Sequence, residues 1–162
     1  MRKYQLWGCA AAAILSLAAC SDENQPQQSE SATINVPDFA KETFSIGKAE
    51  LEQPCRVNSD MVCAVNLFIK CSINSQMAEC QQSKERLPSF VFMQDESLER
   101  PTQVTYNITK LKPLSGGVVE VYTHSQCDGK WFGLCNGNII YVMKPAGQGW
   151  AVQDVYATES AD

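Results

Sequence analysis

Apolar residues recur along this chain with two different spacings, and the change from one to the other comes at Pro88. Before Pro88, the run 61–71 is apolar along most of its length and follows the polar residues 58–60, which are typical helix caps. We therefore expect a helix over 61–71 that is buried on most sides. Its valine and isoleucine content leaves a strand as the alternative. A second, more polar helix is expected from a cap at 74–75 to Pro88, which ends it. Residues 38–55 show no regular spacing, and we expect a short helix or an irregular lead-in there.

Beyond Pro88 the spacing becomes two, which is typical of strands with one buried face. Glycine-containing turns separate the segments, most clearly at 115–117 and 145–149. Helices followed by an antiparallel meander are the pattern of an α+β domain. The expected strands are 90–93, 104–109, 118–122, 139–143 and 150–156.

The N-terminus has the features of a secretory signal peptide. Arg2 and Lys3 precede an uncharged apolar run, Leu6 to Ala19, which is shorter than the roughly 20 residues that a membrane-spanning helix needs. The run ends in Leu17-Ala18-Ala19-Cys20, which resembles the lipobox of bacterial lipoproteins. This resemblance implies that the chain is cut before Cys20 and that the Cys20 thiol carries lipid, which would anchor the protein to a membrane.

The lipoprotein resemblance also implies an address in the cell envelope. Ser21 follows the lipidated cysteine, where aspartate would favour retention in the inner membrane, so the outer membrane is favoured and the domain would face the periplasm or the surface. Residues 21–37 have no aromatic side chain and are rich in polar residues, which predicts a flexible tether. The expected organisation is a signal peptide at 1–19, the lipidated cysteine and tether at 20–37, and one disulfide-stabilised α+β domain at 38–162.

The net charge limits the classes of partner. The chain of 162 residues has a formal charge of −5, and removal of residues 1–19 takes away two of its 13 basic side chains and none of its 18 acidic ones, giving −7. Phosphate backbones repel such a chain, so nucleic acid is not an expected partner. We expect instead an envelope protein as partner, together with the membrane that Cys20 reaches through its lipid.

The cysteines of the domain predict disulfides. Their number is even, the compartment is oxidising, and no spacing matches a metal site, so we expect neither a metal nor a cofactor. Cys63 and Cys71 cannot pair within one helix, because eight residues separate them by about 12 Å along its axis. We favour the pairs Cys55–Cys63 and Cys71–Cys80, with Cys55–Cys71 and Cys63–Cys80 as the alternative. Cys127 and Cys135 flank a stretch that contains the turn residues Asp128-Gly129 and can meet if this stretch loops back, so we pair them with each other.

The C-terminal segment from Trp150 to Val155 carries a second resemblance. Its Trp-x-Val-x-Asp-Val pattern, after a glycine-containing turn, is similar to the closing strands of cystatin-like rolls, in particular SnoaL-like proteins. This implies a roll of sheet around helices. In such a roll, a spacing of two would place Asp154 on the same face as Trp150, Val152 and Tyr156, where a carboxylate could act as a base.

Three functions remain from the sequence. We expect a lipid-anchored, non-catalytic binding or assembly module with no catalytic residue. Its candidate partner-binding residues are Trp131 and Phe132, which lie in the loop that Cys127 and Cys135 close. One alternative is a small cavity-type enzyme of the SnoaL-like class that uses Asp154 and His124. The other is an inhibitor or exclusion factor acting on another envelope protein.

Overall fold

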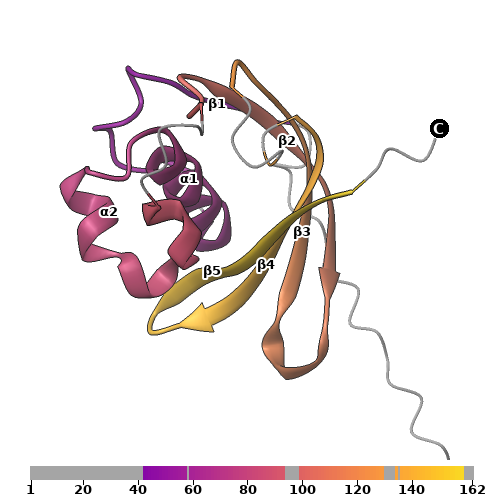
Figure 1. Cartoon of the computed structure of the whole chain (residues 1–162). Coiled ribbons are helices and arrows are strands. Elements are labelled where there is room, and N and C mark those ends of the chain that lie inside the picture. Colours follow the sequence, from indigo (N-terminus) through magenta and orange to yellow (C-terminus); the bar gives the residue numbers. More distant parts are fainter. Residues whose placement is uncertain (1–41, 58, 94–98, 130–133, 135, 159–162) are drawn as a thin grey trace, which may run out of the picture. The chain divides into compact units, whose positions relative to one another are not determined.

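A single antiparallel sheet organises the domain. The computed structural model describes residues 42–57, 59–93, 99–129, 134 and 136–158. The strands lie side by side in the order in which they occur along the chain, and each pairs antiparallel with the next (Figure 1). This confirms the expected α+β class and the meander. The strands are β1 (Thr43–Ile46), β2 (Val104–Pro113), β3 (Val119–Cys127), β4 (Gly137–Ala146) and β5 (Gly149–Thr158).

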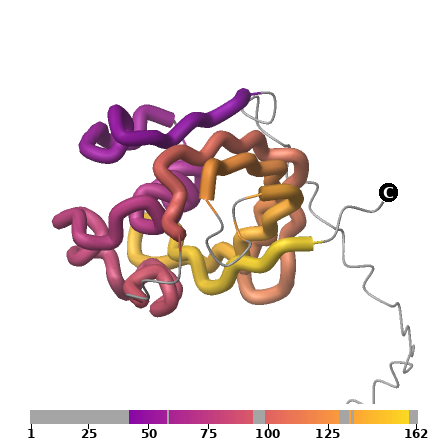
Figure 2. The backbone as a smooth tube through the Cα atoms, turned by 45° about the horizontal axis from the view of Figure 1, so that its top comes forward, coloured from indigo at the N-terminus to yellow at the C-terminus, as the bar shows by residue number. Residues whose placement is uncertain are grey.

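The helix α1 (Asp60–Ile73) fills one face of this sheet, which we call the inner face. It begins where the sequence predicts, because the Ser59 side chain accepts a hydrogen bond from the Val62 N–H at 3.4 Å. Phe68 of α1 meets the ring of Tyr141 on β4 edge to face, with ring centroids 5.4 Å apart. Figure 2 shows the strands from β2 to β5 as an arc, with β1, in indigo, beside β2.

The segment between α1 and β2 is less regular than the sequence predicts. The second helix, α2 (Ala78–Gln82), stops well before Pro88, and a short 3₁₀ turn, η2 (Lys84–Arg86), follows it. The strand expected at 90–93 is wrong, since this segment forms another 3₁₀ turn, η3 (Ser89–Phe92). The carbonyls of Val91 and Met93 accept hydrogen bonds from the Arg100 guanidinium, at 3.0 and 2.9 Å, instead of from a neighbouring strand.

The lead-in contains a strand that the sequence did not reveal. Phe44 and Ile46 of β1 are buried, while Thr43 and Ser45 between them are exposed. Phe44 stacks on Tyr106 of β2 with ring centroids 5.0 Å apart. Four residues are too few for an alternating pattern to stand out, so the expectation of a helix or irregular segment was wrong for this stretch.

The C-terminal hairpin is confirmed and is tighter than expected. β4 and β5 pair from Asn138↔Thr158 to Ala146↔Gly149, which leaves only Gly147 and Gln148 in the turn. Gly147 has a φ of +58°, a left-handed conformation that suits glycine. β5 lies at the edge of the sheet, and the Arg86 guanidinium donates two hydrogen bonds, of 3.0 and 2.7 Å, to the Trp150 carbonyl.

Among the described residues, no helix has the length and apolar character needed to cross a membrane.

Candidate functional site

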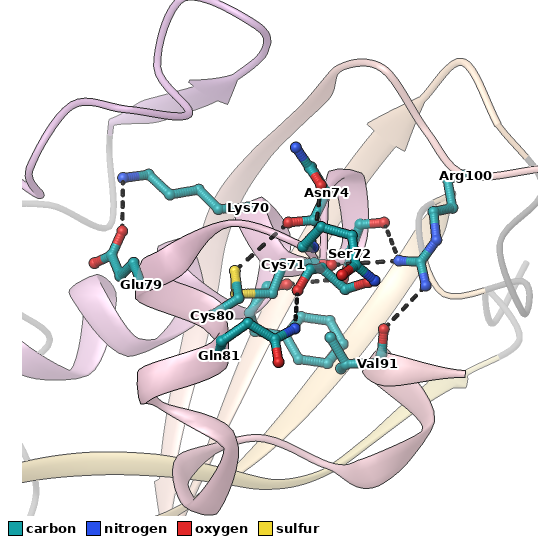
Figure 3. Close-up of a disulfide and its surroundings, with 12 residues drawn as sticks. Lys70, Cys71, Ser72, Asn74, Glu79, Cys80, Gln81, Val91 and Arg100 are labelled. Atoms are coloured by element: carbon teal, nitrogen blue, oxygen red, sulfur yellow. Dashed lines mark hydrogen bonds and ion pairs between the residues drawn. A yellow bond between two sulfur atoms is a disulfide. The ribbon is translucent and has the colours of Figure 1, made fainter. Parts of the chain in front are cut away.

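The disulfides follow the favoured pairing. Cys55 is bonded to Cys63 and Cys71 to Cys80, each with its two α-carbons 5.6 Å apart. Cys127 is also disulfide-bonded, whereas Cys135, the partner expected for it, lies outside the described residues. The disulfides of the first two pairs fasten the segments before and after α1 to the helix itself, and Figure 3 shows the second pair with its surroundings.

Three other residues singled out from the sequence lie outside the part of the chain that the structure describes. They are the expected lipidation site Cys20 and the two candidate partner-binding residues Trp131 and Phe132. Their roles stay predictions.

Asp154 does not lie on the face expected for it. Val142 of β4 pairs with Asp154, but the next residue, Met143, pairs with Val152, so Gln153 is an extra residue that forms a β-bulge. The bulge reverses the alternation, with the result that Val152 is buried on the inner face while Asp154 is exposed on the opposite, outer face. The Asp154 carboxylate accepts a hydrogen bond of 2.8 Å from the backbone N–H of Val155. A single cavity lined by both Val152 and Asp154 is therefore excluded.

His124 is far from Asp154. It lies exposed on β3, with Nδ1 3.2 Å from Oδ1 of Asn138. Because His124 pairs with Asn138 and Asp154 pairs with Val142, the two residues are offset by four positions along β4. That is about 13 Å along the strand, to which two strand spacings add about 10 Å across the sheet. The two side chains cannot act on the same small substrate.

The outer face instead carries a polar cluster around Glu120 that the sequence analysis missed. The Glu120 carboxylate accepts hydrogen bonds from the hydroxyls of Tyr122 (2.8 Å) and Tyr156 (3.0 Å) and from the Lys112 ammonium (3.1 Å). These bonds, that from Tyr122 most of all, lower the pKa of Glu120, although partial burial acts in the opposite direction. The same bond raises the pKa of Tyr122. The cluster satisfies its own charges, which is typical of a structural network.

A different arrangement is found at a pocket between β1, the segment from Glu50 to Arg56, and α1. The cavity has a volume of about 190 Å³. Part of its wall is apolar, from the buried side chains of Phe44 and Ile46 together with Pro54. The rest of the wall is polar, and two of its side chains, Asn66 and Lys70, come from the buried face of α1.

Lys70 is a buried charge with few partners. Its residue is only 4% exposed, and its ammonium donates a hydrogen bond to the Gln53 carbonyl and lies 3.7 Å from a carboxylate oxygen of Glu79 (Figure 3). The Glu79 side chain is 52% exposed, so water competes for it. An ammonium has three N–H donors, and burial of a cation is costly unless they are used. Lys70 thus retains donor capacity beside the pocket.

Asn66 is held in one orientation by β2. The Tyr106 hydroxyl donates a hydrogen bond of 2.6 Å to Oδ1 of Asn66, and both residues are buried. Burial, and then the neighbouring Tyr141, raise the pKa of Tyr106 well above its usual value, so the hydroxyl keeps its proton. With Oδ1 fixed, Nδ2 of Asn66 points to Cys55, whose sulfur is 3.5 Å away. Sulfur is a weak acceptor, and Nδ2 has a second N–H to offer.

Two charged residues complete the pocket. Glu50 accepts a hydrogen bond of 2.9 Å from the backbone N–H of Gly47 through one carboxylate oxygen. Arg56 is exposed and makes no hydrogen bond or ion pair with any part of the chain that the structure describes. The pocket wall therefore contains two cationic side chains, Lys70 and Arg56, and one carboxylate.

Sequence reasoning had one signal that could have found this pocket. Asn66 and Lys70 interrupt the apolar run 61–71 at a spacing of four, which places them on the same side of a helix. Their partners Gln53 and Tyr106 lie 17 and 40 residues away, and no local pattern connects them.

No family model, no curated protein and no solved structure matches the chain. Among the described residues, no group of three histidine, cysteine, aspartate or glutamate side chains is placed to hold a metal ion.

Proposed function

We propose that the chain is a lipid-anchored protein of the bacterial cell envelope, with the outer membrane favoured, whose domain is a non-catalytic binding or assembly module. One observation carries the proposal: every cysteine that the structure describes is disulfide-bonded. Disulfides persist in exported proteins, and the Leu17-Ala18-Ala19-Cys20 sequence supplies the export signal and the anchor. Two acyl chains on Cys20 would hold the domain at a membrane, because each buried methylene contributes about 0.8 kcal/mol.

We further propose that the domain is related to the cystatin-like rolls. The support is α1 on the inner face of a meander sheet, together with the Trp150–Val155 pattern in its last strand. A shared fold does not imply a shared activity, so no activity of those proteins is transferred to this chain.

Binding is favoured over catalysis by the positions of the two candidate catalytic residues. The bulge at Gln153 keeps Asp154 out of the interior, and His124 lies too far from it for shared acid–base work. The enzyme alternative loses the geometry on which it rested. For partner binding, Trp131 and Phe132 stay the candidates from the sequence, and an inhibitor of another envelope protein would be one form of this role.

Mass spectrometry of the protein purified from its native membrane tests the anchor. The expected polypeptide begins at Cys20 and carries acyl chains, and it follows the outer membrane on density separation. A Cys20→Ser variant is expected to keep residues 1–19 and to carry no lipid. A native chain that retains its first 19 residues without acylation would refute the proposed address.

Crosslinking in intact cells tests the binding role. We expect one envelope protein to be captured by the wild type, and capture to be lost when Trp131 and Phe132 are both changed to alanine. Leu114→Ala is the matched control, because Leu114 is a large apolar residue that is 37% exposed and lies outside the 127–135 segment. Equal capture by all three proteins would remove these residues as the binding surface.

A further inference from the structure

We propose that the pocket between β1, the Glu50–Arg56 segment and α1 binds the carboxylate group of a ligand about the size of an amino acid. The inference rests on the binding role proposed above and specifies its ligand chemistry. Its test is independent of the anchor, because binding in solution and lipidation of Cys20 are separate measurements.

The volume of the pocket limits the ligand. About 190 Å³ is the space of roughly six water molecules, and it is smaller than the 300–1,000 Å³ of pockets that take drug-sized molecules. A single amino acid or the last residue of a peptide fits this space. The buried side chains of Phe44 and Ile46 give that residue an apolar wall.

The charges of the pocket favour an anion. Lys70 and Arg56 outnumber the one carboxylate that lines the pocket, that of Glu50; Glu79, which pairs with Lys70 at 3.7 Å, does not line the pocket, and its side chain is 52% exposed, so water screens its charge. A local excess of positive charge inside a recess of low dielectric raises the affinity for a negatively charged ligand. Glu50 would repel a dianion such as phosphate at neutral pH, so a carboxylate with its single charge is favoured.

The donors are arranged for a carboxylate. Lys70 and Asn66 are 4% and 5% exposed, and both have N–H groups beyond those used by their partners within the protein. The Tyr106 hydroxyl fixes the Asn66 amide, so its NH₂ group is already oriented before any ligand arrives. Arg56 at the exposed side adds a guanidinium, the group that best matches the two oxygens of a carboxylate.

Two other recesses among the described residues lack this combination. The hollow beside Asp128 has a volume of about 280 Å³ and the one beside Arg86 about 340 Å³, so both are larger. Their polar side chains are exposed or half-buried, without a buried cation or amide. Size alone therefore does not select the site.

Calorimetric titration of the full mature protein in detergent tests the proposal. The probes are N-acetylalanine, its uncharged amide, trialanine with a free carboxyl group, amidated trialanine and inorganic phosphate. We expect the two carboxylates to bind at least about 10-fold more tightly than their amides, as expected for hydrogen bonds to a charged group. The ratio between N-acetylalanine and trialanine then distinguishes a free small carboxylate from the end of a peptide chain.

Two matched variants locate the binding. Arg56→Gln and Lys48→Gln each remove one positive charge from an exposed position in the connection between β1 and α1, but only Arg56 lines the pocket. We expect Arg56→Gln to weaken carboxylate binding by about 10-fold and Lys48→Gln to leave it within about 2-fold. Asn66→Asp keeps an acceptor for Tyr106 and adds a negative charge to the wall, and it should abolish binding while the protein stays folded by circular dichroism.

The proposal is overturned by any of four results: no binding at millimolar concentration, equal affinity for carboxylate and amide, phosphate binding as tight as carboxylate binding, or equal effects of Arg56→Gln and Lys48→Gln.

Discussion

The helical part of the domain, residues 55–101, and the sheet from β2 to β5 are held together in different ways. The sheet has three strands of ten residues, β2, β4 and β5, and the nine-residue β3; antiparallel pairing joins each strand to the next, with an irregularity between β2 and β3 and another between β4 and β5. Among its described residues, the helical part has one long helix, α1, together with α2 of five residues and 3₁₀ turns of three and four. Two disulfides lie in this part, and each joins α1 to the segment before or after it.

Arg100 shows how the helical part is held. Its guanidinium donates to the carbonyls of Cys71 and Ser72 at the end of α1, and to those of Val91 and Met93 beside η3 (Figure 3). Burial lowers the pKa of Arg100. Helix ends leave carbonyls without partners, and elements this short cannot satisfy them alone. Where a ladder of backbone hydrogen bonds is missing, side chains and covalent bonds replace it.

The largest effect is expected from loss of the buried disulfide. Both cysteines of Cys71–Cys80 are 0% exposed, and the pair closes a loop with a sequence separation of 9. Changing both to alanine should lower the free energy of unfolding by about 3 kcal/mol. Denaturant titration of this variant beside Cys55→Ala/Cys63→Ala compares loops of nearly equal length. If neither variant shifted the midpoint, the helical part would not depend on its covalent bonds.

A smaller effect is expected at the contact between the two parts. Tyr106→Phe leaves Oδ1 of buried Asn66 without its donor from β2, which should cost about 1–2 kcal/mol. Tyr156→Phe removes a hydroxyl from the surface cluster at Glu120 and should cost about 0.5 kcal/mol or less. Thermal denaturation measures both. Equal losses would contradict the distinction between a buried connection and a network at the surface.

The smallest effect is expected at the end of the sheet, from the pH dependence at Asp128, which directly follows β3. Hydrogen bonds from the Thr102 hydroxyl, the Thr102 N–H and the Gln103 N–H lower the pKa of Asp128 to about 2. A depressed pKa means that the carboxylate stabilises the folded state above its ordinary pKa near 3.8, and that this contribution is lost as the pH falls from about 4 to 2. The difference in melting temperature between wild type and Asp128→Asn should shrink over this interval. A constant difference would assign the effect to another group.

What could be predicted from the sequence depends on whether the deciding interaction is local. The β4–β5 hairpin was predictable because alternation and the glycine at Gly147 both act locally. The Gln153 bulge was not predictable, because an extra residue in a strand leaves no mark on the composition. The faces on which Asp154 and Tyr156 lie depend on this bulge, so they could not be predicted either. The strand prediction for 90–93 failed for a related reason. The apolar residues of this segment suit a strand, and the hydrogen bond to the Val91 carbonyl that supports the turn comes from Arg100, outside the segment.

The sequence alone could have indicated part of the candidate pocket. Asn66 and Lys70 stand out as polar residues in an apolar helix, but the groups that fix or face them come from β2 and from the segment after β1. Helix geometry excluded Cys63–Cys71 but left two pairings open, and the turn at 74–75 between Cys71 and Cys80 favoured the pairs that the structure has.

If Cys20 anchors the protein to a membrane as proposed, the position of β5 at the edge of the sheet has a consequence. Anchored copies diffuse in two dimensions at high local density, and an open strand edge is a template on which a neighbouring copy can add a strand. Arg86 already occupies the Trp150 carbonyl, and the Asp154 carboxylate occupies the Val155 N–H. These two side chains, with the bulge at Gln153 between them, would obstruct the addition of a strand along this edge and would favour separate molecules in the proposed membrane layer.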